Sequence, residues 1–517
     1  MTGELFFKPV FVQQSVGPNL LHWAYTSDEN WDAFYSNISA TREGIKISDT
    51  AGVDKFGINV RWNVEGFGFI YITADNGGEF YKLPANGKTE TLNLNFELAK
   101  SRIVRNRKRV DSHKKEGWSS SGELKTFISL SENYFNDAVN AKNDEQKCGD
   151  LSQKSLFYAM QTSEMIELEK AEFDIQRNGR RKNFFIGCDG RGFNQMDPDL
   201  FLELFPQLFN YATITHYLLH STYQDFEPEE GKKQFSLRDV LFRELRKRNV
   251  TVEGRPLFWF YKTVTPDWLR NKSFDQLLKY VETHTKEVVS HYGDEMYAWE
   301  VVNEAHDWAN ELQLKPEQIV EVTKLACEVA KATNPKVHRL INNCCPYAEY
   351  VQIKKWGDLD AKYPQRTPYK FLKDLVDAGV DFTITGQQMY FPYRDLSDII
   401  IYIERLKDFS RPVQLTEVGV SSGPTDASVK DGTLELPTEP YIWRRNWDEE
   451  LQADWVEGVY SMAFSKPWIE AINWYDFVDP YGWIKNGGLI KSPKGEKKLA
   501  FERIIQLKKK WNSLPER

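Results

Sequence analysis

From Lys182 onward the chain is built of short apolar runs that alternate with longer amphipathic stretches. A short apolar run has the length of a buried strand, whereas a stretch such as Pro316 to Ala332 has the length and spacing of a helix. Strands that alternate with helices are typical of a parallel α/β sheet, and eight of them in roughly 300 residues predict a closed (β/α)8 TIM barrel. The eight runs are 184–187, 211–214, 257–260, 297–302, 339–342, 382–385, 413–416 and 471–474.

The first part of the chain has a different pattern. Segments 57–64 and 68–73 alternate apolar and polar residues, which predicts strands of a β-sandwich. Helical spacing follows the polar segment 111–123 and is clearest in 151–176. Because 517 residues exceed what a single core usually supports, we predict several parts: a β-sandwich over 1–115, a helical connector over 116–181 and the barrel over 182–517.

Charge and cysteine content argue against several classes of protein. A formal charge of −8 lacks the basic field of nucleic-acid-binding proteins, and the one basic run, Arg102 to Arg109, is expected to be a solvated loop or strand edge, with a ligand patch as the alternative. Five cysteines without Cys-x-x-Cys spacing indicate neither a disulfide framework nor a zinc site. No apolar stretch reaches the length of a membrane span, and the N-terminus lacks the pattern of a secretory signal. We expect no metal, no cofactor, no nucleic-acid or membrane partner, and a monomer.

Two of the predicted strands end in a glutamate. Glu304 follows Asn303 at the end of the fourth run, and Glu417 ends the seventh. Active sites of such barrels lie at the carboxyl ends of the strands, and glycoside hydrolysis with retention needs two carboxyl groups about 5–5.5 Å apart. Either glutamate alone could be a surface cap or an ion-pair partner. Together they predict Glu304 as general acid/base and Glu417 as nucleophile, with Asn303 placed to bind a sugar 2-hydroxyl.

At these residues the chain resembles glycoside hydrolase family 10, whose barrels are best known as endo-β-1,4-xylanases. Segment 299–304 (Trp-Glu-Val-Val-Asn-Glu) is similar to the acid/base strand of the family, and 415–420 (Leu-Thr-Glu-Val-Gly-Val) is similar to its nucleophile strand. Further similar segments are 254–260, 265–269, 472–476 and 479–483. The matches follow the order of the family and cover 182 to about 511, whereas the resemblance says little about residues 1–180.

The resemblance implies a set of sugar-binding residues. Trp474 and Trp483 would form walls of the cleft near the scissile bond, and Trp259 would lie beneath it, with core packing as the alternative for each ring. Gln388 matches the glutamine of the sixth-strand motif of the family, and Tyr390 stands where the family usually has a histidine that orients the nucleophile.

The chain also departs from the family. Arg255 replaces the first histidine of the third-strand pattern, and the second strand lacks the Glu, Asn and Lys that bind sugar hydroxyls. The Arg255 guanidinium could form a bidentate contact with a uronic-acid substituent of the substrate, or it could form an internal ion pair that holds an acidic side chain. His306 and Asp307 have no third metal ligand at suitable spacing and are expected to be loop residues that line the cleft.

These observations predict an endo-acting retaining β-glycosidase of the xylanase type that acts on a substituted xylan. The alternatives are the same mechanism on another β-glycan, and a non-catalytic carbohydrate-binding protein with a barrel shape. Trp23, Trp31 and Trp62 are candidates for stacking on sugar in the N-terminal part, although packing against the barrel is the favoured interpretation. A polysaccharide or oligosaccharide substrate favours an extracellular or periplasmic location.

Overall fold

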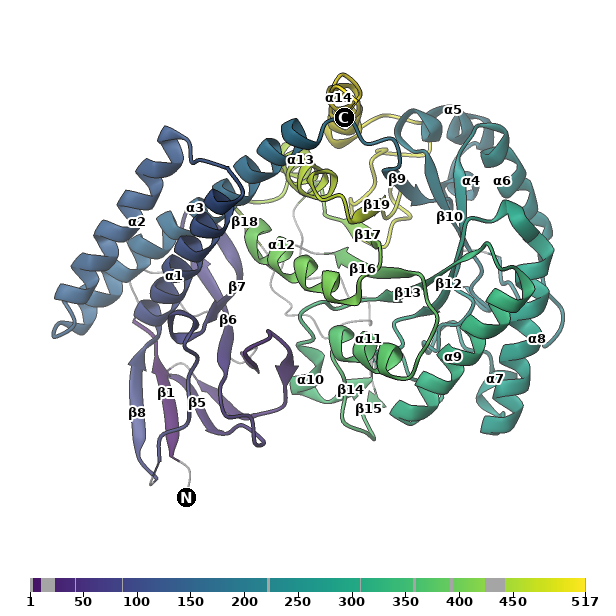
Figure 1. Ribbon diagram of the computed structural model, residues 1–517. Helices are drawn as coiled ribbons and strands as arrows, with labels where there is room; N and C mark the ends of the chain where they lie inside the picture. The colour runs from purple at the N-terminus through teal and green to yellow at the C-terminus, as the bar shows by residue number, and fades with distance from the viewer. Residues whose placement is uncertain are drawn as a thin grey trace.

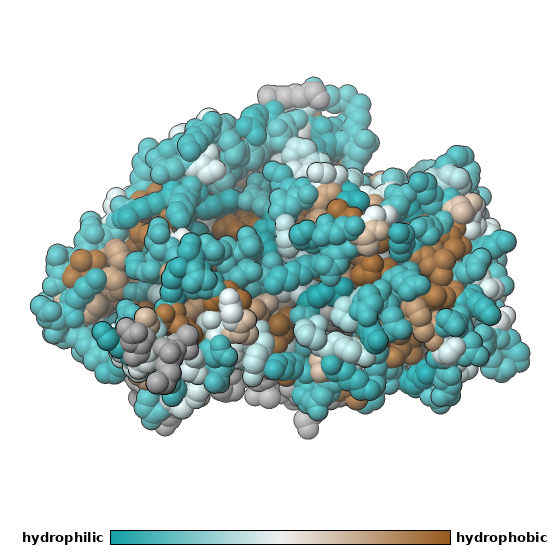
Figure 2. Space-filling model, turned by 60° about the horizontal axis from the view of Figure 1, so that its bottom comes forward, coloured by the Kyte–Doolittle hydropathy of each residue, from teal (hydrophilic) through white to brown (hydrophobic). Residues whose placement is uncertain are grey.

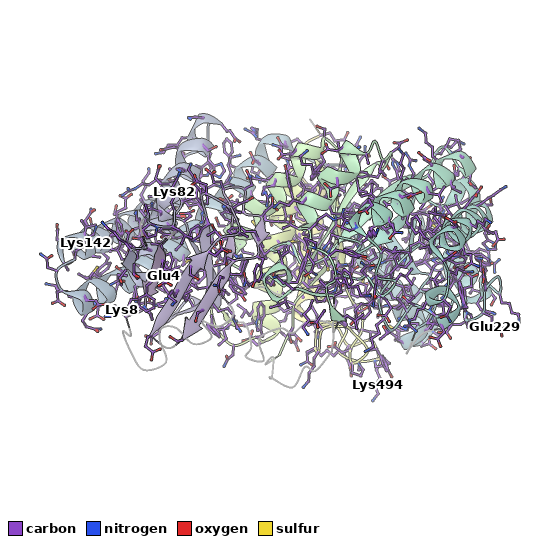
Figure 3. The ribbon with its side chains drawn as sticks, turned by 90° about the horizontal axis from the view of Figure 1, so that it is seen from below. Glu4, Lys8, Lys82, Lys142, Glu229 and Lys494 are labelled. Atoms are coloured by element: carbon purple, nitrogen blue, oxygen red, sulfur yellow. The ribbon has the colours of Figure 1, made fainter. Side chains whose placement is uncertain are left out.

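The structure is a computed structural model, and it describes residues 3–10, 24–41, 43–85, 87–220, 224–306, 308–356, 359–390, 394–423 and 442–516. Figure 1 shows two lobes side by side, with the N-terminal sheets and helices on the left and the barrel on the right. In Figure 3 Lys142 and Glu229 mark the far ends of these two lobes. The face drawn in Figure 2 is mainly hydrophilic, with hydrophobic residues in small separate patches. Within the described ranges, no helix combines the length and the apolar composition of a membrane span.

The described residues of the second lobe form a closed barrel of eight parallel strands, which confirms the predicted fold class. In order around the barrel the strands are β9 (Phe185–Asp189), β10 (Tyr211–Thr215), β11 (Thr251–Arg255), β12 (Ala298–Asn303), β13 (His338–Asn343), β16 (Ile384–Tyr390), β17 (Val413–Gly419) and β19 (Ile469–Trp474). Hydrogen bonds between β19 and β9 close the barrel. Because the strands are parallel, their carboxyl ends share one mouth.

The third strand is the one barrel strand that the apolar runs place wrongly. Strand β11 is Thr251–Arg255, and the predicted run 257–260 lies beyond its carboxyl end. Pro256 has no N–H to donate to a ladder, and the chain then crosses toward β12, where the N–H of Leu257 donates to the carbonyl of Glu300 at 2.8 Å. The shift places Trp259 at the mouth of the barrel rather than inside a strand.

Helices pack against the outside of the barrel and bury its main core between strands and helices. They are α5 (Pro198–Leu208), α6 (Ser236–Lys247), α8 (Phe274–Tyr292), α9 (Pro316–Thr333), α11 (Pro368–Asp377), α12 (Leu396–Arg405), α13 (Glu449–Ser465) and α14 (Leu499–Asn512). Helix α9 begins at Pro316, a favourable first position, and buries Ile319, Val322, Ala326 and Ala330 along one face. The prediction of an amphipathic helix over Pro316 to Ala332 is therefore confirmed. Shorter elements lie in the loops: α4 (Gly192–Gln195), α7 (Asp267–Arg270), η3 (Gly293–Glu295), α10 (Tyr350–Ile353), β14 (Lys355–Trp356), β15 (Leu359–Asp360) and η4 (Leu406–Phe409).

The described N-terminal residues form two sheets that share one hydrophobic core. One sheet has the strand order β4-β5-β1-β8 and the other β18-β7-β6-β2-β3. Phe7 and Ile47 of the first sheet pack in one buried cluster with Val60, Trp62 and Ile72 of the second. The strands are β1 (Glu4–Lys8), β2 (Tyr25–Ser27), β3 (Ala33–Phe34), β4 (Asn37–Thr41), β5 (Gly44–Asp49), β6 (Gly57–Val64), β7 (Gly68–Ala74), β8 (Thr89–Asn93) and β18 (Ile442–Trp443), with the turn η2 (Asn76–Gly78) after β7. Strand β18 comes from the barrel part of the sequence, so the two lobes share this sheet.

Helical structure begins earlier than the sequence pattern indicates. Helix α1 (Leu94–Lys115) lies within the segment predicted as sandwich, and α2 (Gly122–Asn140) and α3 (Glu145–Asn178) follow it. The basic run Arg102 to Arg109 is part of α1, so the prediction of a loop or strand edge is wrong. Arg102 is fully buried, because α1 packs beside the start of α12. The Arg102 guanidinium lies 2.8 Å from Asp395 and 3.1 Å from Asp398.

The N-terminal tryptophans support the packing interpretation. Trp62 is fully buried and its Nε1 donates to Gln153 on α3 at 3.0 Å, so it is not a sugar-stacking surface. Trp31 is half-buried, and the guanidinium of Arg105 lies over its ring at 4.6 Å. Trp23 lies outside the described residues.

Candidate active site

Glu304 and Glu417 line the same pocket of about 400 Å³ at the mouth of the barrel. Glu304 directly follows β12 and has a φ of 54°, a left-handed backbone conformation that is uncommon for a non-glycine residue and is frequent at functional sites. Its N–H donates to the carbonyl of Asn342 at the end of β13 at 2.9 Å. Glu417 lies within β17, where the pairing register with β19 is irregular. Predicted site residues that also line the pocket are Asn303, Trp259, Gln388, Tyr390 and Trp483.

The Glu417 carboxylate is held by donors from neighbouring strands. Its Oε1 accepts hydrogen bonds from the Arg255 guanidinium and, at 3.1 Å, from Asn342 Nδ2. Its Oε2 accepts from the hydroxyl of Tyr390. Hydrogen bonds and a cation favour the charged form of a buried carboxyl group. This environment suits a nucleophile, which must be an anion when it attacks.

Glu304 has a different environment. Its Oε2 accepts from Trp259 Nε1 at 2.9 Å and its Oε1 accepts from Gln388 Nε2 at 3.0 Å. The pKa of Glu304 is raised from 4.5 to about 7, mainly by burial and then by the negative charge of Glu417, while the two donors and the Arg255 cation oppose the rise. A carboxyl group with this pKa can hold a proton near neutral pH and release it to a leaving group, as a general acid must.

Asn303 is connected to both glutamates through amide side chains. Its Oδ1 accepts hydrogen bonds from Asn342 Nδ2 at 3.1 Å and from Gln388 Nε2 at 3.2 Å. Gln388 also donates to Glu304, and Asn342 also donates to Glu417, so one network spans the two carboxyl groups. Since the oxygen of Asn303 is used within the protein, any hydrogen bond to a sugar hydroxyl must come from its NH2 group.

Arg255 does not stand in the cleft as a substrate contact. Its side chain is 1% exposed, and it pairs with Glu417 and, through Nε, with Glu300 at 3.3 Å. The hypothesis that Arg255 binds a uronic-acid carboxylate is therefore wrong, and the structure has the favoured interpretation, an internal ion pair. The reason is that Arg255 ends β11 with its side chain between strands, where the carboxyl groups of Glu300 on β12 and Glu417 on β17 lie within reach of its guanidinium.

The tryptophans of the last strand differ in position. Trp474 is fully buried, and its Nε1 donates to the carbonyl of Gly487 at 3.0 Å, so the prediction of a cleft wall is wrong for this ring and core packing is observed. Trp483, in the loop that follows, is half-buried and lines the pocket. Trp259 also lines the pocket and stacks on Tyr261 with ring centroids 5.1 Å apart. Contact of Trp259 and Trp483 with sugar stays a prediction.

His306 lies behind the pocket rather than on its wall. It is fully buried, with Nδ1 2.8 Å from the Tyr350 hydroxyl and Nε2 3.2 Å from the backbone nitrogen of Cys344. Burial lowers the pKa of His306 to about 3, so it is neutral at ordinary pH. The expectation that His306 lines the cleft is wrong, and Asp307 lies outside the described residues. Over the residues that the structure covers, no group of His, Cys, Asp and Glu side chains is arranged to hold a metal ion.

The sequence pattern missed other residues of the site. Asn342 closes the fifth apolar run, one residue before the end of β13, and could have been found by the rule that identified Glu304. Arg191 lines the pocket, with its Nε 2.8 Å from Asp189 and its guanidinium paired with Asp476. The pairing of Arg191 with Asp476 has no signal in the sequence, because the two residues come from opposite ends of the barrel part.

The barrel part of the chain is similar in sequence to known proteins. The sequence model of the family described as Glycosyl hydrolase family 10 matches residues 219–510. The match begins after β10, so it omits the first two barrel strands, which the resemblance had included. Endo-1,4-beta-xylanase B of Thermotoga neapolitana is 24% identical over 321 residues, which cover 58% of this chain and 80% of the relative. Beta-1,4-xylanase of Dictyoglomus thermophilum is 28% identical over 303 residues, which cover 53% of this chain and 77% of the relative.

Among solved structures, xylanase 10B of Thermotoga petrophila in complex with xylobiose is 20% identical, with a TM-score of 0.48 and coverage of 64% of this chain and 95% of that one. The family match rests on the sequence, includes both Glu304 and Glu417, and spans more than half of the chain. The chain therefore belongs to glycosyl hydrolase family 10.

Proposed function

We propose that this protein is a retaining endo-β-1,4-xylanase that cleaves the backbone of a substituted xylan by double displacement. The chain is a glycoside hydrolase of the endo-1,4-β-xylanase type, and the retaining mechanism in this proposal rests on one observation. Two carboxyl groups line one pocket in different environments: Glu417 accepts hydrogen bonds from the Arg255 guanidinium and the Tyr390 hydroxyl, and the pKa of Glu304 is raised to about 7.

These environments define a role for each group in the proposed reaction. Glu417 attacks the anomeric carbon while Glu304 gives its proton to the glycosidic oxygen, and the aglycone leaves. Glu304, now an anion, takes a proton from a water molecule that attacks the glycosyl ester on Glu417, and the sugar leaves with its configuration retained. Tyr390 and Arg255 hold the Glu417 carboxylate in place, and Trp259 and Gln388 orient the carboxyl group of Glu304.

Xylan is the proposed substrate because the curated relatives are named as xylanases. The pocket also has aromatic walls at Trp259 and Trp483, which suit the C–H faces of sugar rings. A panel of xylans, β-glucans and other β-linked polysaccharides tests this assignment. Faster release of reducing ends from a β-glucan than from every xylan would favour the alternative substrate.

Azide separates the two carboxyl groups chemically. With an activated β-xylobioside, Glu304→Ala should be rescued by azide to give the β-glycosyl azide, because the covalent intermediate on Glu417 still forms. Glu417→Ala should lose several orders of magnitude in turnover and, with azide, give the α-azide instead. Mass spectrometry of the parent enzyme trapped with a 2-fluoro-xyloside should place the label on the peptide that carries Glu417. A label on Glu304, or a parent chain without turnover, would contradict the assignment, and the second result would support a non-catalytic binding barrel.

A further inference from the structure

Two adjacent cysteines, Cys344 and Cys345, line the pocket that holds the catalytic glutamates. Both carry free thiols, and their Sγ atoms are 3.2 Å apart. Cys345 has a φ of 45°, in the left-handed region, although it precedes Pro346, a position that favours extended backbone. The backbone thus adopts an unusual conformation at the place where it brings the two sulfurs together. We propose that Cys344 and Cys345 form a redox-active dithiol that closes to a vicinal disulfide in the cleft wall.

The two cysteines differ in exposure and in their neighbours. Cys345 is half-buried and lines the cleft, whereas Cys344 is 6% exposed, so Cys345 is the proposed point of attack on a small reagent. The Cys344 Sγ lies 3.3 Å from His306 Nε2. That nitrogen also accepts from the Cys344 N–H at 3.2 Å and so carries a lone pair, while the opposite ring nitrogen faces the Tyr350 hydroxyl.

The oxidant in this proposal is a small-molecule disulfide such as oxidised glutathione. The Cys345 thiol loses its proton and attacks one sulfur of the reagent, which forms a mixed disulfide and releases the first small thiol. The Cys344 thiol then loses its proton and attacks the Cys345 Sγ, and the second small thiol leaves with that proton. In the balance, two protein S–H bonds and one reagent S–S bond become one protein S–S bond and two small-thiol S–H bonds.

The product should be readily reduced again. Adjacent Cα atoms are at most about 3.8 Å apart, which is less than the usual separation of roughly 4.4–6.8 Å across a disulfide. Disulfides that depart from the usual geometry are strained, and strained disulfides are the labile ones. The other cysteines lie in separate cores, Cys148 among the N-terminal helices and Cys188 and Cys327 in the barrel core, so none of them competes for this bond.

Closure of the pair is coupled to catalysis through strand β13. Cys344 is two residues beyond Asn342, which accepts the N–H of Glu304 and donates to the carboxylate of Glu417. A ring formed at residues 344 and 345 requires a change in the backbone there, and displacement of Asn342 would move both carboxyl groups. A shift of about 1 Å in a catalytic group can cost on the order of 100-fold in rate. We expect a reversible loss of kcat/KM of roughly tenfold to 100-fold in the oxidised enzyme.

The test uses the full chain, incubated with oxidised glutathione or with dithiothreitol, alkylated under denaturing conditions and digested with trypsin. The peptide from Leu340 to Lys354 contains Cys344 and Cys345 and no other cysteine. After oxidation it should be unalkylated and lighter by two hydrogen atoms than the reduced peptide. Two alkylated cysteines, or a stable glutathione adduct on Cys345, would overturn the proposal. The measurement depends neither on a variant nor on xylanase activity, so it stands apart from the proposed function.

Kinetic controls test the coupling. Turnover by Cys344→Ser/Cys345→Ser should not respond to the oxidant, whatever its baseline, whereas Cys327→Ser, altered at a buried cysteine of helix α9, should respond as the parent does. Equal kcat/KM in the closed and open parent enzyme would refute the link to catalysis.

Discussion

The hydrogen bond from Trp259 to Glu304 makes a quantitative prediction about the pH dependence of this enzyme. A donor to a charged group contributes about 1.5–3 kcal/mol, and one pKa unit corresponds to about 1.4 kcal/mol. The Trp259 Nε1 is 2.9 Å from Glu304 Oε2, and it opposes the rise of the Glu304 pKa to about 7. Trp259→Phe keeps an aromatic ring but removes this donor. The pKa of Glu304 should therefore rise by about one to two units.

The assay is kcat/KM as a function of pH with two aryl xylobiosides. With a poor leaving group the reaction needs the proton of Glu304. The fall of kcat/KM at alkaline pH, the alkaline limb, should therefore have its midpoint near pH 7 in the parent and about one to two units higher in Trp259→Phe. With a 2,4-dinitrophenyl leaving group, which departs without a proton, this limb should weaken in both proteins. Trp308→Phe is a matched control, because Trp308 lines the same pocket while Glu304 takes its side-chain hydrogen bonds from Trp259 and Gln388. An alkaline limb that stays in place or moves to lower pH in Trp259→Phe would refute the reasoning.

Three further predictions concern stability and specificity. The pKa of Glu304 is about 7 in the fold against an ordinary 4.5, so the stability that its proton provides is complete below about pH 4.5 and is lost as pH rises through about 7. The free energy of unfolding of Glu304→Gln, relative to that of the parent, should therefore be higher by roughly 3 kcal/mol at pH 8 than at pH 4 in urea unfolding. An equal difference at both pH values would contradict this. Arg255→Leu leaves buried carboxyl groups unpaired, so it should cost about 3–5 kcal/mol of stability and reduce activity equally on glucuronoxylan and on neutral arabinoxylan. A loss of activity confined to glucuronoxylan would instead support direct contact between Arg255 and the substrate. A fragment of residues 182–517 should unfold well below the full chain in thermal circular dichroism, because Asp395 and Asp398 lose the buried arginines of α1; equal melting temperatures would refute this dependence.

The N-terminal sheet contacts residues that line the cleft. Arg394 lines the pocket, and it is held from behind by Tyr25 at 2.6 Å, Asn59 at 2.7 Å and Thr73 at 2.8 Å, all from the N-terminal sheet. Tyr25 and Tyr71 pack in one buried cluster with pocket residues such as Tyr347. The N-terminal sheet therefore supports one wall of the site, which is a role that an independent binding module would not have.

The sequence by itself determined the barrel and its two glutamates. Alternation of apolar runs and amphipathic stretches is a local property, and it predicts strands and helices without knowledge of what they contact. Because parallel strands place their carboxyl ends at one mouth, the positions of Glu304 and Glu417 at strand ends were sufficient to predict that they share a site. The same rule extends to Gln388 on β16, whose polar side chain lies near the end of its strand.

Only the tertiary structure decided which way the remaining side chains point. Arg255 could have faced substrate or protein, and its partner Glu417 is 162 residues away in the sequence, so no local pattern links them. Trp474 and Trp483 are nine positions apart, yet one is in the core and the other lines the cleft, because the strand ends at Trp474 and the loop carries Trp483 back over the mouth. The basic run of α1 is buried for the same reason, since its counter-charges Asp395 and Asp398 come from the other lobe. Periodicity identifies the elements, whereas the pairing of buried charges and rings depends on contacts that form only when distant segments pack together.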